Sequence, residues 1–270
     1  MVSKDLARFS LATGLPAKNV EKEIKLFTLM PKFFHLLEER KIKTALFGGT
    51  ALNKGYYAEK QRFSKDLDID CFSRNWRAVY NKITEALLDS DISKEYRVQT
   101  TKFDVPSTIK EWTLWYGKNP WENLLIEMNT KQVAIDRTIK SLPLHSFLEF
   151  HGMVLTPVYV PSYSLEHLLA RKILALARRQ VGKDIYDVFM GFKHSPDRVV
   201  LRAYVGALAK SEWKMDFSSF VESIIHWLDR VTGGTSDVVE LAETVPLTYR
   251  EDIKTMIESI KFELRRLGEV

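Results

Sequence analysis

Two aspartates separated by one residue, Asp66 and Asp68, are the side chains of this sequence that are best spaced to do chemistry. In a strand, this spacing sends both carboxylates to one face while Leu67 points to the other. Neighbouring carboxylates repel each other unless a cation lies between them. Magnesium prefers oxygen ligands and is commonly held by one or two carboxylates together with substrate phosphates. The pair therefore predicts a site for a divalent metal ion, Mg²⁺ or Mn²⁺.

A glycine turn precedes the two aspartates. Gly48, Gly49 and Thr50 follow a short apolar segment and begin a short predicted helix. Glycines let the backbone approach a phosphate closely, and amides at a helix N-terminus favour an anion. We expect this turn to hold the phosphates of a nucleoside triphosphate, with Arg62 and Ser64 touching phosphate or bracing the site. The turn and the carboxylates together indicate metal-assisted transfer of a nucleotidyl group.

The composition narrows the class of protein without identifying its substrate. The 270 residues suffice for one large or two modest domains. A net charge of +5 and a pI of about 9.1 are compatible with binding a nucleotide or RNA but do not require it. The single cysteine, Cys71, excludes an intrachain disulfide and predicts the cytoplasm. No apolar stretch reaches the ~20 residues of a membrane span, and the six histidines lack the spacing of a zinc site.

The first part of the chain alternates between helical and strand patterns, which is typical of a mixed sheet with flanking helices. We expect helices at 17–40, 50–57 and 76–88 and strands at 43–47, 67–72, 96–104, 112–116, 123–129 and 154–160. A Pro-Ser turn is expected between the strands at 96–104 and 112–116. Pro31 should kink or divide the first helix. Pro157 cannot donate to a ladder, so we expect 154–160 at the sheet edge.

Helical periodicity dominates after Pro161. We expect helices at 164–180, 183–193, 196–211, 217–231 and 249–267, with the Gly233-Gly234 pair separating the last two. Asp184 and Asp187 would share a helix face. Lys172 lies within an otherwise apolar face, where a lysine either reaches solvent or meets an anion. The chain is therefore predicted to be α+β, with an N-terminal helix and mixed sheet in residues 1–161 and a helical domain in residues 162–270.

The order of these motifs resembles a known family. The strand, Gly-Gly-Thr turn, helix and Asp-x-Asp strand are similar to the nucleotidyltransferase fold of the DNA polymerase β superfamily. In more detail, the chain resembles the AbiEii/AbiGii toxin family of nucleotidyltransferases from about residue 17 to residue 192. The segments that carry this resemblance are 20–23 (VEKE), 47–52 (FGGTAL), 62–68 (RFSKDLD), 165–173 (LEHLLARKI) and 183–188 (KDIYDV).

The resemblance implies a metal-dependent enzyme that transfers a nucleoside monophosphate from a nucleoside triphosphate. It implies the toxin of a toxin–antitoxin pair, with a cognate antitoxin as partner and the 3′ end of tRNA or a protein serine as acceptor. It also implies that Lys172 and one of Asp184 and Asp187 are needed for activity. A third metal-binding carboxylate should lie on a strand next to the aspartate pair, and Glu127 is our candidate.

Two departures from the family pattern leave rival functions open. Phe47 stands where a lysine often precedes the glycines, and Lys183 stands where an arginine is common. One rival is an enzyme that transfers a nucleotide to a small molecule, as antibiotic-modifying relatives do. The other is a non-catalytic nucleotide- or RNA-binding module. Asp70 is expected to be a bystander, and Arg178 and Arg179 either line an RNA path or end a helix in solvent.

Overall fold

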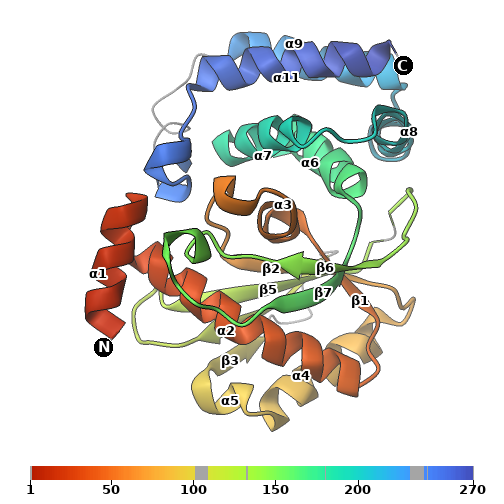
Figure 1. Cartoon of the computed structure of the whole chain (residues 1–270). Helices are drawn as coiled ribbons and strands as arrows, with labels where there is room; N and C mark the ends of the chain where they lie inside the picture. Colours follow the sequence, from red (N-terminus) through yellow and green to blue (C-terminus); the bar gives the residue numbers. More distant parts are fainter. Residues whose placement is uncertain are drawn as a thin grey trace.

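The protein is a mixed sheet with helices on both faces and a stack of further helices above one of them (Figure 1). The computed structural model describes residues 2–100, 109–131, 133–179, 181–231, 240–241 and 243–269. The expected Pro-Ser turn and the Gly233-Gly234 pair lie outside these residues. The predicted α+β class is confirmed.

The strands are β1 Thr44–Phe47, β2 Asp66–Cys71, β3 Arg97–Thr100, β4 Ile109–Trp115, β5 Asn123–Asn129, β6 Lys140–Leu144 and β7 Val158–Ser162. They form one sheet in the order β3-β4-β5-β2-β1-β7-β6. The central strand β2 runs antiparallel to β1 and parallel to β5. Every second residue of β2 and β5 packs into the core, where Leu67, Ile69, Ile126 and Met128 are fully buried. This alternation leaves the other face of both strands for polar residues.

The prediction of an edge strand at 154–160 is wrong. β7 starts only after Pro157 and lies between β1 and β6, so an unpredicted strand forms that edge of the sheet. β7 pairs with β1 at a single register position, Leu46 with Ser162, and the Ser162 hydroxyl reinforces it by donating to the Leu46 carbonyl over 2.7 Å. β6 contains Pro143, whose missing N–H is tolerated at an edge.

Helices cover both faces of the sheet. The lower face in Figure 1 is covered by α2 Ala17–Glu39, α4 Trp76–Asp89 and α5 Ile92–Glu95, and α3 Gly48–Tyr56 lies on the other face. The first helix, α1 Val2–Thr13, was not predicted, and it packs on the start of α2 through a small cluster that includes Phe9 and Val20. Pro31 does not divide α2, which continues through it, and a kink there stays a prediction. Burial on both sides of the proline, for example of Phe27 and Phe34, holds the helix together despite one lost hydrogen bond.

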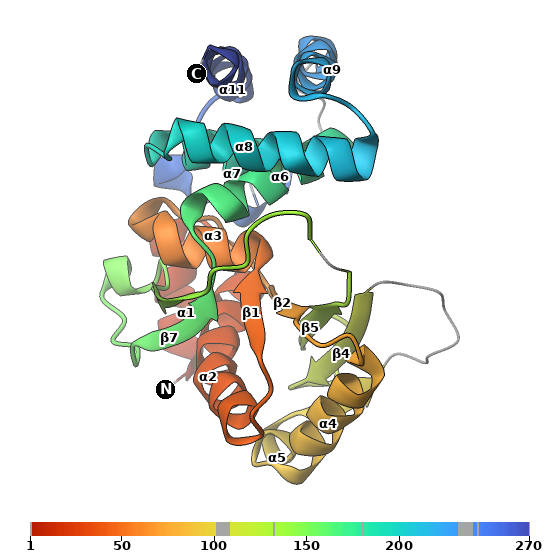
Figure 2. The same ribbon diagram turned by 90° about the vertical axis from the view of Figure 1, so that its right-hand side faces the viewer.

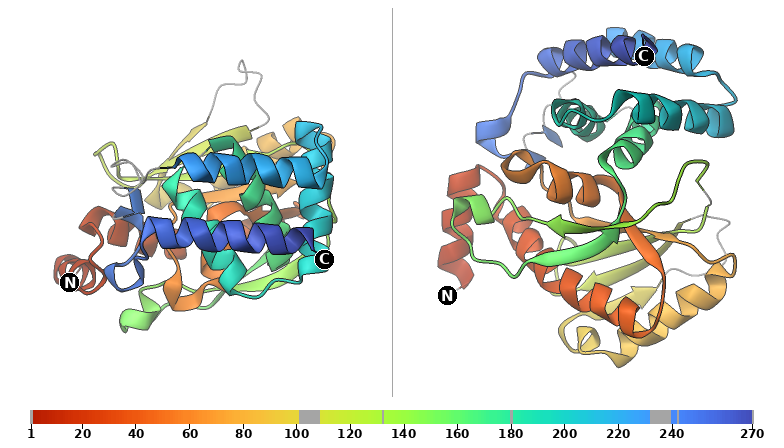
Figure 3. Two further views of the ribbon diagram at one scale, coloured as in Figure 1. Left: turned by 90° about the horizontal axis from the view of Figure 1, so that it is seen from above. Right: turned by 45° about the vertical axis from the view of Figure 1, so that its right-hand side comes forward.

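The C-terminal helices form two further layers above α3 (Figures 1 and 2). Their bounds are α6 Leu165–Arg179, α7 Gly182–Lys193, α8 Arg198–Leu208, η3 Ala209–Trp213, α9 Phe217–Arg230, η4 Leu247–Tyr249 and α11 Ile253–Gly268. α6 and α7 lie directly above α3, and α9 and α11 run side by side as the outermost layer (Figure 3). One hydrophobic cluster runs from the sheet into these helices. The domain boundary after residue 161 therefore stays a prediction. Within the described residues, no helix combines the length and apolarity needed to cross a bilayer.

Candidate active site

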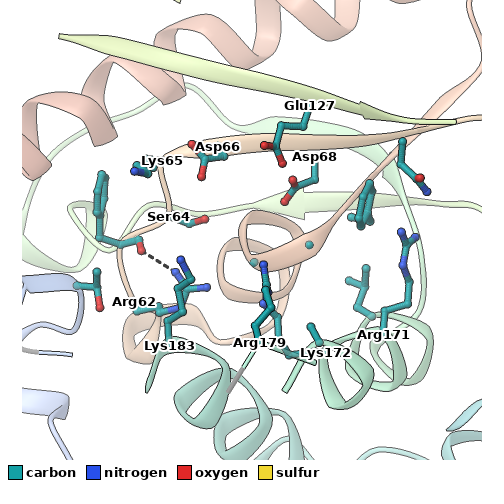
Figure 4. A pocket seen from close by; sticks show the side chains of 18 of the residues that line it. Arg62, Ser64, Lys65, Asp66, Asp68, Glu127, Arg171, Lys172, Arg179 and Lys183 are labelled. Atoms are coloured by element: carbon teal, nitrogen blue, oxygen red, sulfur yellow. Dashed lines mark hydrogen bonds between the residues drawn. The ribbon is translucent and has the colours of Figure 1, made fainter. Parts of the chain in front are cut away.

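Three carboxylates from two neighbouring strands point into one cleft (Figure 4). β2 and β5 pair in parallel with Asp68 opposite Glu127, and Asp66 lies two residues before Asp68 on the same strand. The alternation that buries Leu67 turns both aspartates to the opposite face. The cleft has a volume of about 830 Å³ and is also lined by Gly48.

The three carboxylates carry more negative charge than their surroundings neutralise. Burial, a hydrogen bond with Asp68 and the charges of Asp68 and Asp66 raise the pKa of Glu127 to about 8. Burial and the charge of Asp68 raise the pKa of Asp66 to about 6, although Lys65, among other lysines, opposes this rise. Burial and repulsion between neighbouring carboxylates therefore favour the protonated form of Glu127 and of Asp66.

A divalent metal fits this group only together with a substrate. Among the described residues, no three His, Cys, Asp or Glu side chains form a preformed metal-binding cluster. Mg²⁺ is usually completed by water and substrate phosphates around one or two carboxylates, so a closed protein cage is not required. The donor set of three carboxylates on two paired strands has the oxygen chemistry that suits a hard cation.

The glycine turn lies directly against the carboxylates. Gly48 has a φ of +75°, in the region that favours glycine, and a Cβ on it would come within 2.0 Å of Asp68 Oδ2. A Cβ on Gly49 would come within 2.6 Å of Arg62 Nη2. Any larger side chain would displace a carboxylate or a guanidinium of the cleft. The first turn of α3 also leaves backbone amides without intrahelical partners beside the cleft.

The Thr50 hydroxyl, unlike the glycines, is used inside the protein. It bonds the Ser64 hydroxyl at 2.7 Å and donates to the Asp66 carbonyl. Thr50 is fully buried and does not line the cleft, whereas Ser64 does. Thr50 and Ser64 thus tie the glycine turn to the start of β2.

A basic wall faces the carboxylates across the cleft, as Figure 4 shows. Its members come from three segments: Arg62 from the loop before β2, Lys172 and Arg179 from α6, and Lys183 from α7. Their cationic groups point toward the space in front of the aspartates (Figure 4). Cations at this position are suited to polyphosphate.

Asp187 supports this wall from behind. Its carboxylate accepts hydrogen bonds from Arg62 Nε at 2.8 Å and Nη2 at 2.6 Å, and from Asn53 Nδ2 at 2.7 Å. It also lies 2.9 Å from Lys172 Nζ. Burial alone would raise the pKa of Asp187, but Arg62 and Lys172 outweigh it and hold this pKa at about 2. Asp187 is therefore a buried anion that positions two cations of the cleft.

Asp184 positions Arg179 and, together with Asp187, Lys172. It bonds Lys172 Nζ at 3.0 Å and receives the Arg179 guanidinium through two bonds of 2.9 and 3.0 Å. Neither Asp184 nor Asp187 lines the cleft, and both are fully buried. The sequence left open which of the two is needed for activity, and this stays a prediction; in the structure both contact Lys172.

Asp70, the third aspartate of β2, belongs to a separate structural cluster. Arg171 bonds it at 2.5 and 3.2 Å, Tyr163 donates to it at 2.7 Å and Asn129 at 2.8 Å. Burial alone would raise the pKa of Asp70, but Arg171 and these hydrogen bonds lower it. The cluster ties β2 to α6 and leaves Asp70 no free oxygen for a metal.

Sequence reasoning assigned no role to several cations that the structure places at the cleft. Lys22 from α2 and Lys65 from the loop before β2 lie beside Asp66 and lower its pKa. The segment 20–23 contains Lys22 and was noted only for its resemblance. Nothing in the local pattern told these lysines apart from ordinary surface residues, because their role depends on the fold bringing α2 next to β2.

Comparisons with known proteins bear on the family and the fold of this chain. The family model of the nucleotidyl transferase AbiEii toxin of type IV toxin–antitoxin systems matches residues 35–265. MenT4, a nucleotidyltransferase toxin from Mycobacterium tuberculosis H37Rv, has a similar solved structure with a TM-score of 0.70 at 14% sequence identity. That match covers 98% of this chain and 89% of MenT4, and at this identity it bears on the fold alone. No curated protein matches the chain significantly in sequence.

Proposed function

The chain belongs to the AbiEii family of nucleotidyltransferase toxins of type IV toxin–antitoxin systems, and on that premise we propose its substrates and the roles of its residues. The proposed reaction is transfer of a nucleoside monophosphate from a nucleoside triphosphate to a hydroxyl of an RNA acceptor, with Mg²⁺ or Mn²⁺ required. The family match extends past residue 192, where the sequence motifs ended, into the C-terminal helices.

One observation carries this proposal: an acidic strand face lies opposite a basic wall across a single cleft (Figure 4). A metal–triphosphate complex has both signs of charge and fits between the two. Asp66, Asp68 and Glu127 would hold the metal. When bound, the metal lowers the pKa of the acceptor hydroxyl and neutralises charge on the departing pyrophosphate.

The protein's own groups orient the triphosphate. The backbone amides of Gly48 and Gly49 would donate hydrogen bonds to phosphate oxygens at the start of α3, and Ser64 lines the cleft beside them. Arg62 and Lys172, each fixed by Asp187, would hold the β- and γ-phosphates. The acceptor oxygen then forms a bond to the α-phosphorus, and the bond from that phosphorus to the β-phosphate bridge breaks. The hydroxyl proton leaves to a carboxylate of the cleft or to water.

The charge of the cleft favours RNA as the acceptor over a cationic small molecule. Ten of the described lining residues are lysine or arginine, and six are aspartate or glutamate. A basic groove attracts the backbone of a nucleic acid, whereas a cationic antibiotic needs an acidic pocket. A protein hydroxyl is the second acceptor consistent with the family, and we propose a cognate antitoxin and a cytoplasmic location on the same ground.

A transfer assay tests the proposed function. The protein is incubated with each α-labelled nucleoside triphosphate, Mg²⁺, total RNA and total protein, and the label is followed into RNA, protein and small-molecule fractions. Label in RNA is expected, and Asp66→Asn or Asp68→Asn should reduce it at least about 100-fold, which corresponds to ~3 kcal/mol of barrier. Asp91→Asn removes an exposed carboxylate from outside the cleft and is the matched control.

The distribution of the label decides between the acceptors. Label in protein alone would replace RNA by a protein hydroxyl, and label in small molecules alone would favour the antibiotic-type rival. Tight binding of triphosphate without release of pyrophosphate, in the presence of both acceptors, would point to the non-catalytic binding module. Transfer that is unchanged in Asp68→Asn would contradict the proposed site.

A further inference from the structure

The cleft continues past the carboxylates along a second face of α6. Lys172 and Arg179 lie seven residues apart, so they share one face of the helix, and both bond Asp184. Arg171 and Arg178 have the same spacing on the neighbouring stripe and also line the cleft. The apolar lining of the cleft includes Ile109, Val133, Leu174, Ala175 and Leu208.

The carboxylate of Glu212 lies in the cleft beside Arg178. Glu212 Oε2 accepts a hydrogen bond from Arg178 Nη2 at 2.7 Å and lies 3.1 Å from Lys131 Nζ. Arg178 is the second-last residue of α6, and Lys131 follows β5 two residues after Asn129. One oxygen thus bridges the helical part of the molecule and the sheet. The carboxylate is only 13% exposed, whereas the Lys131 and Arg178 side chains are 51% and 57% exposed.

The segment that brings Glu212 into the cleft has an unusual backbone. Residues Ala209–Trp213 form a π-helical turn at the end of α8, and Lys214 then adopts a left-handed conformation with a φ of 57°. Single π-turns within helices are rare and are frequent at functional sites. Trp213 Nε1 is buried without a hydrogen-bond partner among the described residues. A regular continuation of α8 would rotate Glu212 to a different side of the helix, so the irregular turn determines where this carboxylate lies.

We propose that Lys131 and Arg178 form a subsite for a backbone phosphate of a single-stranded RNA acceptor, and that Glu212 is its resident anion, displaced when the acceptor enters. The proposal rests on the proposed function, since it assumes that the acceptor is RNA. A phosphate oxygen has the charge and bonding capacity of Glu212 Oε2, and an arginine with a lysine binds phosphate readily. Because both cations are half-exposed, they can turn from the carboxylate to a phosphate with little desolvation.

The position of the subsite suits an acceptor strand. Arg178 lies six residues beyond Lys172 on α6, which is about 9 Å along the helix axis. A strand whose terminal hydroxyl lies in front of Asp68 would therefore place a phosphate a few nucleotides from its end near Arg178. Apolar side chains that line the cleft can contact unstacked bases. The same lining does not suit a charged triphosphate, which belongs at the glycine turn.

Removal of the resident anion provides the test. Glu212→Gln keeps the size of the side chain and removes its charge, so binding of a labelled single-stranded RNA oligonucleotide, measured by anisotropy without triphosphate, should tighten about 3- to 10-fold. Since one more phosphate contact is then available, the slope of log affinity against log salt should steepen by about 0.7. Glu95→Gln is the matched control, because Glu95 also pairs with a lysine but lies on α5, on the opposite side of the sheet.

A second substitution confirms which cation gains the phosphate. Arg178→Ala in the Glu212→Gln background should return RNA affinity to the wild-type level or below it. Equal affinities of Glu212→Gln and Glu95→Gln would overturn the proposal, and so would tighter binding of a triphosphate analogue with RNA affinity unchanged. The readout needs no turnover. A failed transfer assay with a positive binding result would therefore contradict the enzymatic proposal and leave the subsite supported.

Discussion

The substitution Asp187→Asn tests whether the buried aspartates position the basic wall of the cleft. The Asp187 carboxylate is the only described anion that contacts Arg62, and it shares Lys172 with Asp184. An asparagine keeps the shape but leaves Arg62, which is only 6% exposed, without a counter-charge. Removal of one partner from a buried ion pair costs about 3–5 kcal/mol.

The loss of stability should be larger for Asp187→Asn than for Asp184→Asn. For a chain of this length, 1 kcal/mol corresponds to roughly 2–4 °C in Tm, so Asp187→Asn should lower Tm by about 6–20 °C. Asp184→Asn should cost less, because its partner Arg179 is 50% exposed and can be solvated instead. Transfer activity should fall in both variants, since Lys172 loses one of its two carboxylates in each.

Calorimetry and the transfer assay measure these two effects separately. The double variant Arg62→Met with Asp187→Leu removes the pair as a unit, so most of the stability should return while activity stays low. The reasoning would be refuted by an Asp187→Asn protein that melts like the wild type, or by one that is more stable than Asp184→Asn.

Three further predictions follow from the same contacts. Gly48→Ala forces a Cβ against Asp68 Oδ2 at a φ of +75°. Transfer activity should therefore fall ~100-fold, while the free energy of unfolding should drop by only about 1–2 kcal/mol. Transfer activity within tenfold of the wild type would contradict this prediction. Burial lowers the pKa of His167 to about 4, below that of the unfolded chain near 6.5. The unfolded state therefore binds more protons between these values, and stability should be complete above pH 6.5 and fall by up to about 3 kcal/mol toward pH 4. The melting temperature of His167→Gln should depend less on pH across this range. A slope of melting temperature against pH equal to that of the wild type would exclude His167 as the cause of the loss of stability in acid. Arg171→Gln leaves Asp70 buried without a cation and should cost about 3 kcal/mol in denaturant titration, and a cost below 1 kcal/mol would show that the pair is not structural.

Local pattern was sufficient to predict the strands that carry the carboxylates. Asp66, Asp68 and Glu127 alternate with large apolar residues, and a period of two determines which face each side chain takes. The parallel register that sets Asp68 opposite Glu127 is a tertiary property, and so is the order of the strands. For this reason the position of β7 was predicted wrongly from Pro157 alone, although the strand itself was anticipated.

The supporting contacts of the site could not be predicted, because they join residues that are far apart in the chain. Asp187 meets Arg62 across 125 positions, and the sequence indicated only that it shares a helix face with Asp184. Thr50 was predicted at a phosphate, which stays a prediction, and the sequence did not indicate that its hydroxyl bonds Ser64 and the Asp66 carbonyl. A hydroxyl next to glycines fits either role, and the second depends on the packing of α3 on β2.

The most direct test of the central claim is the metal dependence of triphosphate binding. Calorimetric titration of the protein with a non-hydrolysable nucleoside triphosphate analogue should show binding at least about tenfold tighter in Mg²⁺ than in EDTA, because Asp66, Asp68 and Glu127 face the basic wall across one cleft. In Asp68→Asn this difference should disappear while the weaker binding in EDTA remains. Equal affinity of the wild-type protein in Mg²⁺ and in EDTA would contradict the account.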